Sequence, residues 1–221
     1  MILLPGMLLA MFAQARVQSA YRKYLQIGSA YGHNGAHAAQ TLLHAHGIYD
    51  VEVVQGAGEL TDQYDPRRRQ IVLSPNVYHS SSIAALAIAA HETGHAIQHS
   101  EGYIPLSFRS SLAPVAQISS TAALPLFFIG MLLGSYTFAM LGIYLFTGVI
   151  IFQMVTLPVE FNASRIALIA LDSYGIVTRD EYSGARKVLS AAALTYVASL
   201  AVSLLQLLRL LALSGSNRRR R

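Results

Sequence analysis

Apolar residues are gathered into long blocks along this chain, with shorter polar segments between them. Residues 115–134 and 138–157 contain no Asp, Glu, Lys or Arg, and each block has about the 20 residues that a membrane-spanning helix needs. Only a short turn near residues 134–137 separates them, so we expect an antiparallel transmembrane hairpin at residues 112–157. A hairpin returns the chain to the membrane face that it left, which places the segments before and after it on one side.

Two further apolar blocks lie at the ends of the chain. Residues 1–17 are predicted to form an N-terminal membrane anchor. A signal peptide is the alternative, but no basic residue precedes the apolar stretch. Residues 188–213 are long enough to span a membrane with tilt, so we interpret residues 188–221 as a C-terminal transmembrane helix with a basic tail.

The positions of basic residues predict which side of the membrane the polar segments occupy. Arg16, Arg22 and Lys23 follow the first apolar block, and the positive-inside rule then puts the next segment on the cytoplasmic side. If all four apolar blocks span, both termini lie outside, and the arginines at 218–221 break the same rule. The orientation of the terminal spans is therefore left open.

Residues 18–111 have a pattern typical of a small α+β module. Helices are predicted at residues 36–46 and 82–100, and short strands at residues 51–54 and 70–74. We interpret residues 71–73 as an edge strand that could pair with an extended substrate. The predicted fold is a mainly α membrane protein, in which a helical transmembrane bundle is joined to this module.

The amino-acid composition is typical of a membrane protein and argues against several other classes of protein. The chain is 53% hydrophobic and 12% charged, whereas charged residues make up about a quarter of a soluble domain. It has no cysteine, which excludes disulfides and thiolate metal sites. We attribute the net charge of +5 to topology and lipid headgroups rather than to nucleic-acid binding, because no basic stripe with interleaved aromatic residues is present.

One motif in the predicted helix at residues 82–100 indicates metal chemistry. His91, Glu92 and His95 form an H-E-x-x-H pattern, and positions i and i+4 of an α-helix lie on one face. Two imidazoles so placed can bind one Zn²⁺, and Glu92 can act as a general base toward a water. His99 follows after another four residues, but it lies about 12 Å from His91 along the axis, too far to share one zinc.

A catalytic zinc site takes three protein ligands and leaves one position for water, so a third ligand must come from outside this helix. Glu160 is our first choice, because it follows the hairpin and so lies on the same side as the two histidines. Residues 158–187 are predicted to begin with a helix that Pro158 opens, with Glu160 near its start. This segment would carry the third ligand.

Other carboxylates compete with Glu160 for this role. Asp172 is the rival, and it would place the zinc within the membrane. Asp62 and Asp65 rank below it, because their place in a turn explains them adequately. The residue that stabilises the oxyanion is left open among Arg165, Tyr64 and His99.

Several runs of residues resemble the bacterial neutral zinc metallopeptidases of the YugP type, whose layout is similar to that of the HtpX-like membrane proteases. The resemblance extends nearly from end to end and is carried by AAHETGHAIQH at 89–99, LTDQYDP at 60–66, VTLPVEFNAS at 155–164, AAALTYVA at 191–198 and LLQLL at 204–208. In HtpX-like proteases a glutamate on a helix after the hairpin completes the zinc site, and Glu160 matches it. The family usually has histidine and aspartate where this chain has Gln63 and Asn162, and both departures bear on how the metal is tuned.

Together these features predict a membrane-bound, zinc-dependent endopeptidase in a multi-pass protein of the bacterial cell membrane. One Zn²⁺ per chain would be bound by His91, His95 and Glu160, with Glu92 as the general base. The expected partners are a polypeptide substrate, membrane proteins included, and the lipid bilayer. The alternative is a non-catalytic membrane scaffold with a structural or degenerate zinc site, although a closed structural site needs four protein ligands. The sequence leaves the substrate and the oligomeric state open.

Overall fold

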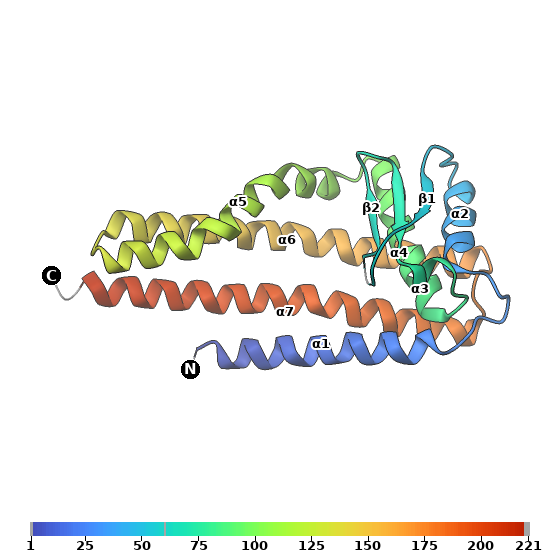
Figure 1. The fold of residues 1–221 in the computed structure, drawn as a ribbon, viewed down its shortest axis with the longest axis horizontal. Coiled ribbons are helices and arrows are strands. Elements are labelled where there is room, and N and C mark those ends of the chain that lie inside the picture. Colours follow the sequence, from blue (N-terminus) through green and yellow to red (C-terminus); the bar gives the residue numbers. More distant parts are fainter. Residues whose placement is uncertain (1, 60, 219–221) are drawn as a thin grey trace.

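A computed structural model describes residues 2–59 and 61–218, and it confirms a mainly α fold with a small sheet. Long helices make up one end of an elongated molecule, and the sheet lies at the other end (Figure 1). The strands are β1 (Glu52–Gln55), β2 (Gln63–Asp65) and β3 (Gln70–Leu73). The helices are α1 (Leu4–Leu25), α2 (Gly35–Ala45), α3 (Pro75–Tyr78), α4 (Ile83–Ser100), α5 (Ile104–Leu132), α6 (Tyr136–Ser173) and α7 (Arg179–Arg218).

Among the described residues, three helices are long and apolar enough to cross a membrane, namely α5, α6 and α7. Helices α5 and α6 form the predicted antiparallel hairpin (Figure 1). Gly134 turns the chain between them with a φ of 65°, a backbone conformation that favours glycine. The expected hairpin is therefore confirmed as a pair of apolar helices.

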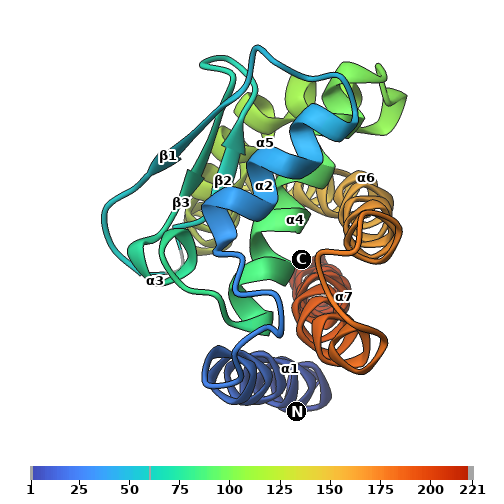
Figure 2. The same cartoon turned by 90° about the vertical axis from the view of Figure 1, so that its right-hand side faces the viewer.

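The predicted N-terminal anchor is the first part of a longer helix. Helix α1 continues without a break to Leu25 and lies beside α7 (Figures 1 and 2). It is not among the three helices that are apolar enough to span by length and composition, so the anchor at residues 1–17 stays a prediction. The basic tail at residues 219–221 lies outside the described part of the chain.

One boundary in the prediction is wrong. Pro158 does not open a new helix, because α6 continues through it from Tyr136 to Ser173. A proline inside a helix removes one backbone hydrogen bond, but long apolar helices tolerate this loss where neighbouring helices pack around them. Val159, next to the proline, is fully buried. Glu160 is thus held in the interior of the helix that forms the second limb of the hairpin.

The sheet also corrects one expectation. Its strand order is β1-β3-β2, with β1 parallel and β2 antiparallel to β3. The two predicted strands correspond to β1 and β3, whereas β2 was missed because three residues carry no readable alternation. Since β3 is paired on both sides, residues 71–73 are not an edge strand. The free edges belong to β1 and β2.

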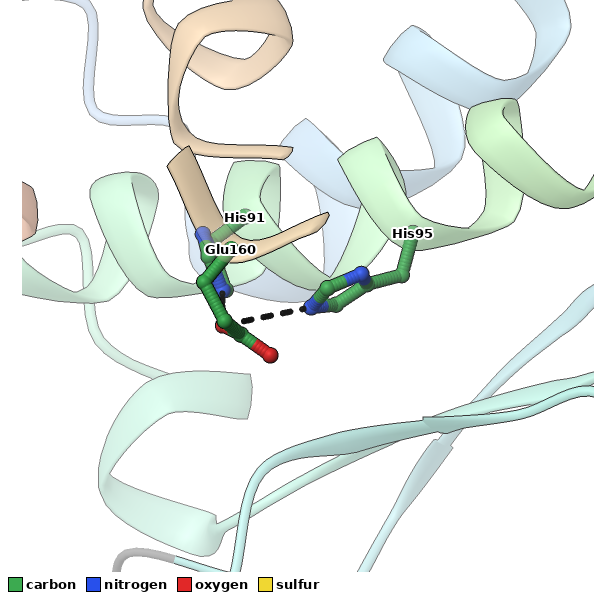
Figure 3. A group of neighbouring side chains, drawn as sticks. All are labelled: His91, His95 and Glu160. Atoms are coloured by element: carbon green, nitrogen blue, oxygen red, sulfur yellow. Dashed lines mark hydrogen bonds and ion pairs between the residues drawn. The ribbon is translucent and has the colours of Figure 1, made fainter. Parts of the chain in front are cut away.

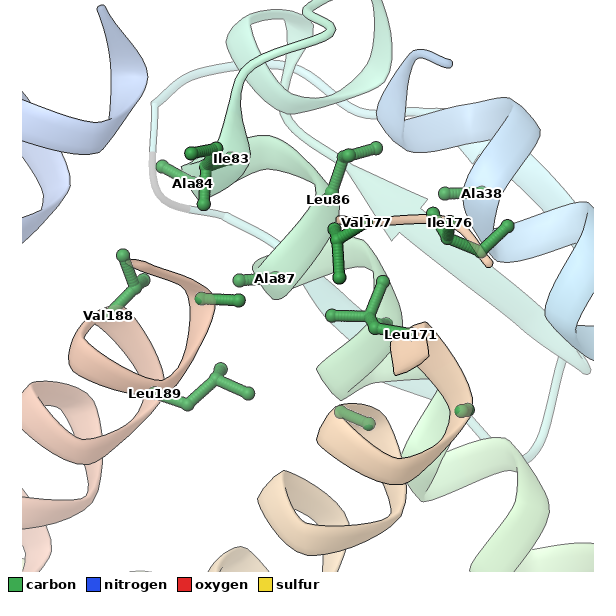
Figure 4. Packing of buried hydrophobic residues seen from close by; sticks show 14 of the residues in the cluster. Ala38, Ile83, Ala84, Leu86, Ala87, Leu171, Ile176, Val177, Val188 and Leu189 are labelled. Atoms are coloured by element: carbon green, nitrogen blue, oxygen red, sulfur yellow. The ribbon is translucent and has the colours of Figure 1, made fainter. Parts of the chain in front are cut away.

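Helix α4 lies at the centre of the module, between the sheet and α2 on one side and α6 and α7 on the other (Figure 2). The Ser82 hydroxyl caps its N-terminus by accepting a hydrogen bond from the Ala85 N–H at 3.2 Å. Leu86 packs in a buried cluster with Leu171 of α6 and Leu189 of α7 (Figure 4). Small alanines elsewhere on α4 let these neighbours approach closely, and this packing fixes the helix that carries the motif.

Candidate metal centre

Three side chains from α4 and α6 converge on one point (Figure 3). The ligand atoms of His91, His95 and Glu160 all lie within 4.8 Å of one another. The Glu160 Oε2 atom is 3.2 Å from Nε2 of His91 and 3.7 Å from Nε2 of His95. Ligand atoms of a tetrahedral zinc with bonds of roughly 2.1 Å are about 3.4 Å apart, so the donor set fits a zinc ion.

A glutamine fixes the orientation of the His95 ring. The Gln98 amide N–H groups donate to the Val159 carbonyl at 2.9 Å and to Asn162 Oδ1 at 2.8 Å. Its Oε1 is thereby left to accept from Nδ1 of His95 at 3.0 Å. With the proton on Nδ1, the lone pair of Nε2 faces Glu160 and is free to bind a metal.

His91 is oriented in a similar way from the other helix. Its Nδ1 lies 3.2 Å from the hydroxyl oxygen of Ser164, which is one turn beyond Glu160 on α6. When Nδ1 donates this hydrogen bond, Nε2 carries the lone pair on the side of Glu160. Both imidazoles therefore present the same nitrogen to the centre; α6 contacts His91 directly through Ser164 and supports His95 indirectly, by holding Gln98 of α4.

Two further residues hold the Glu160 carboxylate. Nη1 of Arg109, from α5, lies 3.3 Å from Oε1, the oxygen that does not face the histidines. The Tyr196 side chain of α7 also interacts with this carboxylate. Oε1 is thus held by Arg109, which directs Oε2 at the two imidazoles. Since the side chain of Glu160 is only 3% exposed, this pairing offsets the cost of burying a charge.

Charges around His95 affect its proton affinity. Burial lowers the pKa of His95, but the contact with Glu160 and the nearby charge of Glu92 outweigh burial and raise the pKa above its ordinary value of 6.5. A metal at Nε2 must therefore displace a proton that the ring binds more tightly than usual.

Two cavities meet at this group of side chains. One of about 350 Å³ lies between β2 and α5, and the other of about 240 Å³ lies between α1 and α7. Glu92 lines both cavities, although it is only 8% exposed. It therefore sits beside the converging ligand atoms, where a general base for a hydrolytic reaction must be.

The other predicted ligands are not part of this group, although Asp62 lines both adjoining cavities. Asp172 is in the last turn of α6, about 18 Å beyond Glu160 along the helix axis. Asp62 accepts hydrogen bonds from the backbone N–H and hydroxyl of Ser74, and Asp65 accepts from the N–H of Arg67. Within the described chain, His91, His95 and Glu160 are the group of three that could hold a metal ion.

The residues predicted as candidates for oxyanion stabilisation lie in different places in the structure. Tyr64 lines the β2-side cavity, and its hydroxyl is 2.7 Å from Nδ1 of His99. Arg165 lines a different groove between α6 and α7. Arg109 and Tyr196 were not predicted from the sequence, because only the packing of α5 and α7 against α6 brings these two side chains to Glu160. Gln98 and Ser164 could have been found, since they follow His95 and Glu160 by three and four residues on the same helix faces.

Comparison with known proteins shows the family of this chain. Residues 1–215 match the family model described as "Putative neutral zinc metallopeptidase". The chain belongs to this family. One relative of this chain is "Putative membrane protease YugP" of Bacillus subtilis (strain 168), which is 48% identical over 201 residues, or 91% of this chain and 89% of the relative. No solved structure matches the chain.

Proposed function

We propose that this protein is a membrane-bound zinc endopeptidase. The observation that carries the proposal is the convergence of two imidazole nitrogens and the Glu160 carboxylate, with Glu92 in the adjoining cavities. Membership of a zinc metallopeptidase family and the three apolar helices support it. His91, His95 and Glu160 would bind one Zn²⁺ per chain.

Each residue of the centre has a role in peptide hydrolysis. When bound, zinc would polarise the scissile carbonyl and lower the pKa of water toward neutrality. Glu92 would take the proton from the attacking water and pass it to the leaving amine. Arg109 borders the β2-side cavity and carries a positive charge beside the centre, so we assign it the stabilisation of negative charge on the carbonyl oxygen.

The sheet offers a binding mode for the peptide backbone. One edge of β2 pairs with β3, and the residues Gln63 and Tyr64 of β2 line the same cavity as His91 and Glu92. An extended peptide that hydrogen-bonds to the free edge of β2 would pass directly in front of the centre. Such pairing would recognise a substrate mainly through hydrogen bonds to its backbone, which every polypeptide offers, membrane proteins included.

The centre joins α4, which belongs to the module that contains the sheet, to α6, the second helix of the apolar hairpin. We place this module on the cytoplasmic face of a bacterial membrane, because Arg22 and Lys23 end the first helix next to it. A scaffold with a closed structural zinc site is the weaker proposal, since among the described residues the group has three ligands rather than four. This difference favours an open, catalytic site.

The test is proteolysis by the detergent-purified full-length chain, with an unfolded protein as substrate. We expect cleavage that stops on addition of a zinc chelator and returns when zinc is restored. Glu92→Gln should keep the zinc and lose at least about 100-fold in rate, because general base catalysis contributes 10²–10⁴-fold. Glu101→Gln, a change of the same type at the exposed end of α4, is the matched control and should cleave normally. Cleavage by Glu92→Gln at the wild-type rate would overturn the assignment of the base.

A further inference from the structure

The cavity between α1 and α7 borders the metal centre, but most of the residues that line it have no role in the chemistry described above. Helix α1 presents one continuous face to it, since its lining positions have the i, i+3, i+4, i+7 spacing. The residues of α7 that line the cavity, Val188, Leu189 and Ala192 among them, also lie on one face of that helix, and α4 contributes Ile88. The walls are mainly apolar and include Val17, Tyr21, Ile88, Val188, Leu189 and Ala192.

The size and position of this cavity fit a single large side chain. Its volume is about 240 Å³, and an apolar cavity of about 150 Å³ is enough to bind a benzene ring. It shares His91, Glu92 and Glu160 with the β2-side cavity. A peptide held along β2 with its scissile bond at the centre can therefore direct a neighbouring side chain between α1 and α7.

Two of the three carboxylates that line the cavity, Asp62 and Glu160, already have partners in the structure, and the third, Glu92, is assigned to the attacking water. Asp62 accepts hydrogen bonds from Ser74, and Glu160 is paired with Arg109 and the two histidines. A cationic side chain would find these carboxylates engaged, and an anionic one would be repelled by them. Burial of apolar surface remains as the main source of affinity.

We propose that this cavity is the specificity pocket of the enzyme and accepts a large apolar residue, such as Leu, Met or Phe, beside the scissile bond. The inference rests on the proposed peptidase activity and goes further, because it names the residue class that is recognised. It also gives the first helix a role in recognition, since α1 forms one wall of the pocket. Substrates would then be cut next to apolar residues close to the membrane surface.

The test uses the zinc-loaded full-length protein and a set of peptides that differ only in the residue on each side of the scissile bond. We expect kcat/KM for Leu or Phe to exceed that for Ala or Asp by at least about 10-fold at one of the two positions. Ala192→Phe should fill the pocket, lower kcat/KM for the large apolar residue by about 10- to 100-fold, and spare the Ala peptide. Ala201→Phe on the opposite face of α7 is the matched control and should keep the wild-type preference.

Two results would overturn the pocket, and both are distinct from a failure of the peptidase proposal. Equal kcat/KM for Leu and Asp at both positions would show that no apolar pocket is used. An equal loss for every peptide in Ala192→Phe, with zinc content unchanged, would show that the cavity does not select side chains. Cleavage of no peptide by the zinc-loaded wild type would contradict the proposed activity itself, and the pocket with it.

Discussion

A Cβ atom on Gly94 would lie only 2.6 Å from the carbonyl oxygen of Ala163, because the backbones of α4 and α6 almost touch where the helices cross. Gly94 is inside the H-E-x-x-H motif, and Ala163 is three residues after Glu160. The crossing therefore sets the separation between the two histidines and the carboxylate. A glycine is required there for close approach rather than for its backbone conformation.

Substitution of this glycine should damage both stability and metal binding. Gly94→Ala forces the backbones apart, and we expect a loss of about 1–3 kcal/mol in the free energy of unfolding together with lower zinc content. Thermal unfolding and elemental analysis of the purified protein measure the two effects. The matched control is Gly148→Ala in α6, where the nearest atom is 3.9 Å away and a gain of up to about 1 kcal/mol is expected from helix propensity. Equal behaviour of the two variants would contradict the packing argument.

The contacts behind the histidines should tune metal affinity. Gln98→Met removes the acceptor of the His95 Nδ1–H, and Ser164→Ala removes the partner of His91. Each should weaken zinc binding by about 10- to 100-fold, as is typical for residues that support metal ligands. Competition with a chelator of known affinity measures the change. Ser120→Ala, on an exposed face of α5, is the control and should bind zinc as the wild type does.

Arg109 should matter for catalysis, whereas Arg165 should not. Arg109→Met removes the positive charge beside the centre, and a loss of about 100-fold in kcat/KM is expected for one such donor. Arg109→Lys should recover part of it. Arg165→Met changes a residue of the separate groove and should leave kcat/KM within about twofold. The reverse result, with Arg165 essential and Arg109 dispensable, would contradict this assignment and support Arg165 as the residue that stabilises the oxyanion.

Zinc affinity should depend on pH in the direction set by His95. Its pKa in the metal-free protein is raised above 6.5, so the stability that protonated His95 contributes is present below pH 6.5 and is lost as the pH rises through the raised value. Zinc requires the neutral ring, and its affinity should therefore rise over that same interval. Calorimetry in buffers of different ionisation enthalpy should detect protons released at pH 6.5 and fewer at higher pH. His99→Gln should give the same proton count, and no release at pH 6.5 would contradict the assignment.

Features of the fold and the site could be predicted where residues close together in the sequence determine them. The spacing of His91 and His95 is read directly from helix geometry, and the hairpin is read from two uncharged blocks. Glu160 was chosen from the side of the membrane that it occupies, although the predicted helix start at Pro158 was wrong. Packing around α6 outweighed the local effect of the proline.

Features formed by contacts between distant segments could not be read in this way. The three residues of β2 are too few for a periodic pattern, so β3 was mistaken for an edge strand. Arg109 and Tyr196 reach Glu160 from α5 and α7, and nothing near them in the sequence marks this. The apolar cavity likewise requires α1 and α7 to lie side by side, which follows from the whole fold.

The most direct test of the central claim is the zinc content of the detergent-purified wild type beside Glu160→Ala and Asp172→Ala. We predict about one zinc per chain in the wild type and in Asp172→Ala, because the Asp172 carboxylate lies about 18 Å along α6 from Glu160. Glu160→Ala should lose the metal, since it removes one of three converging ligands. Zinc retained in Glu160→Ala and lost in Asp172→Ala would contradict the account and place the site within the membrane.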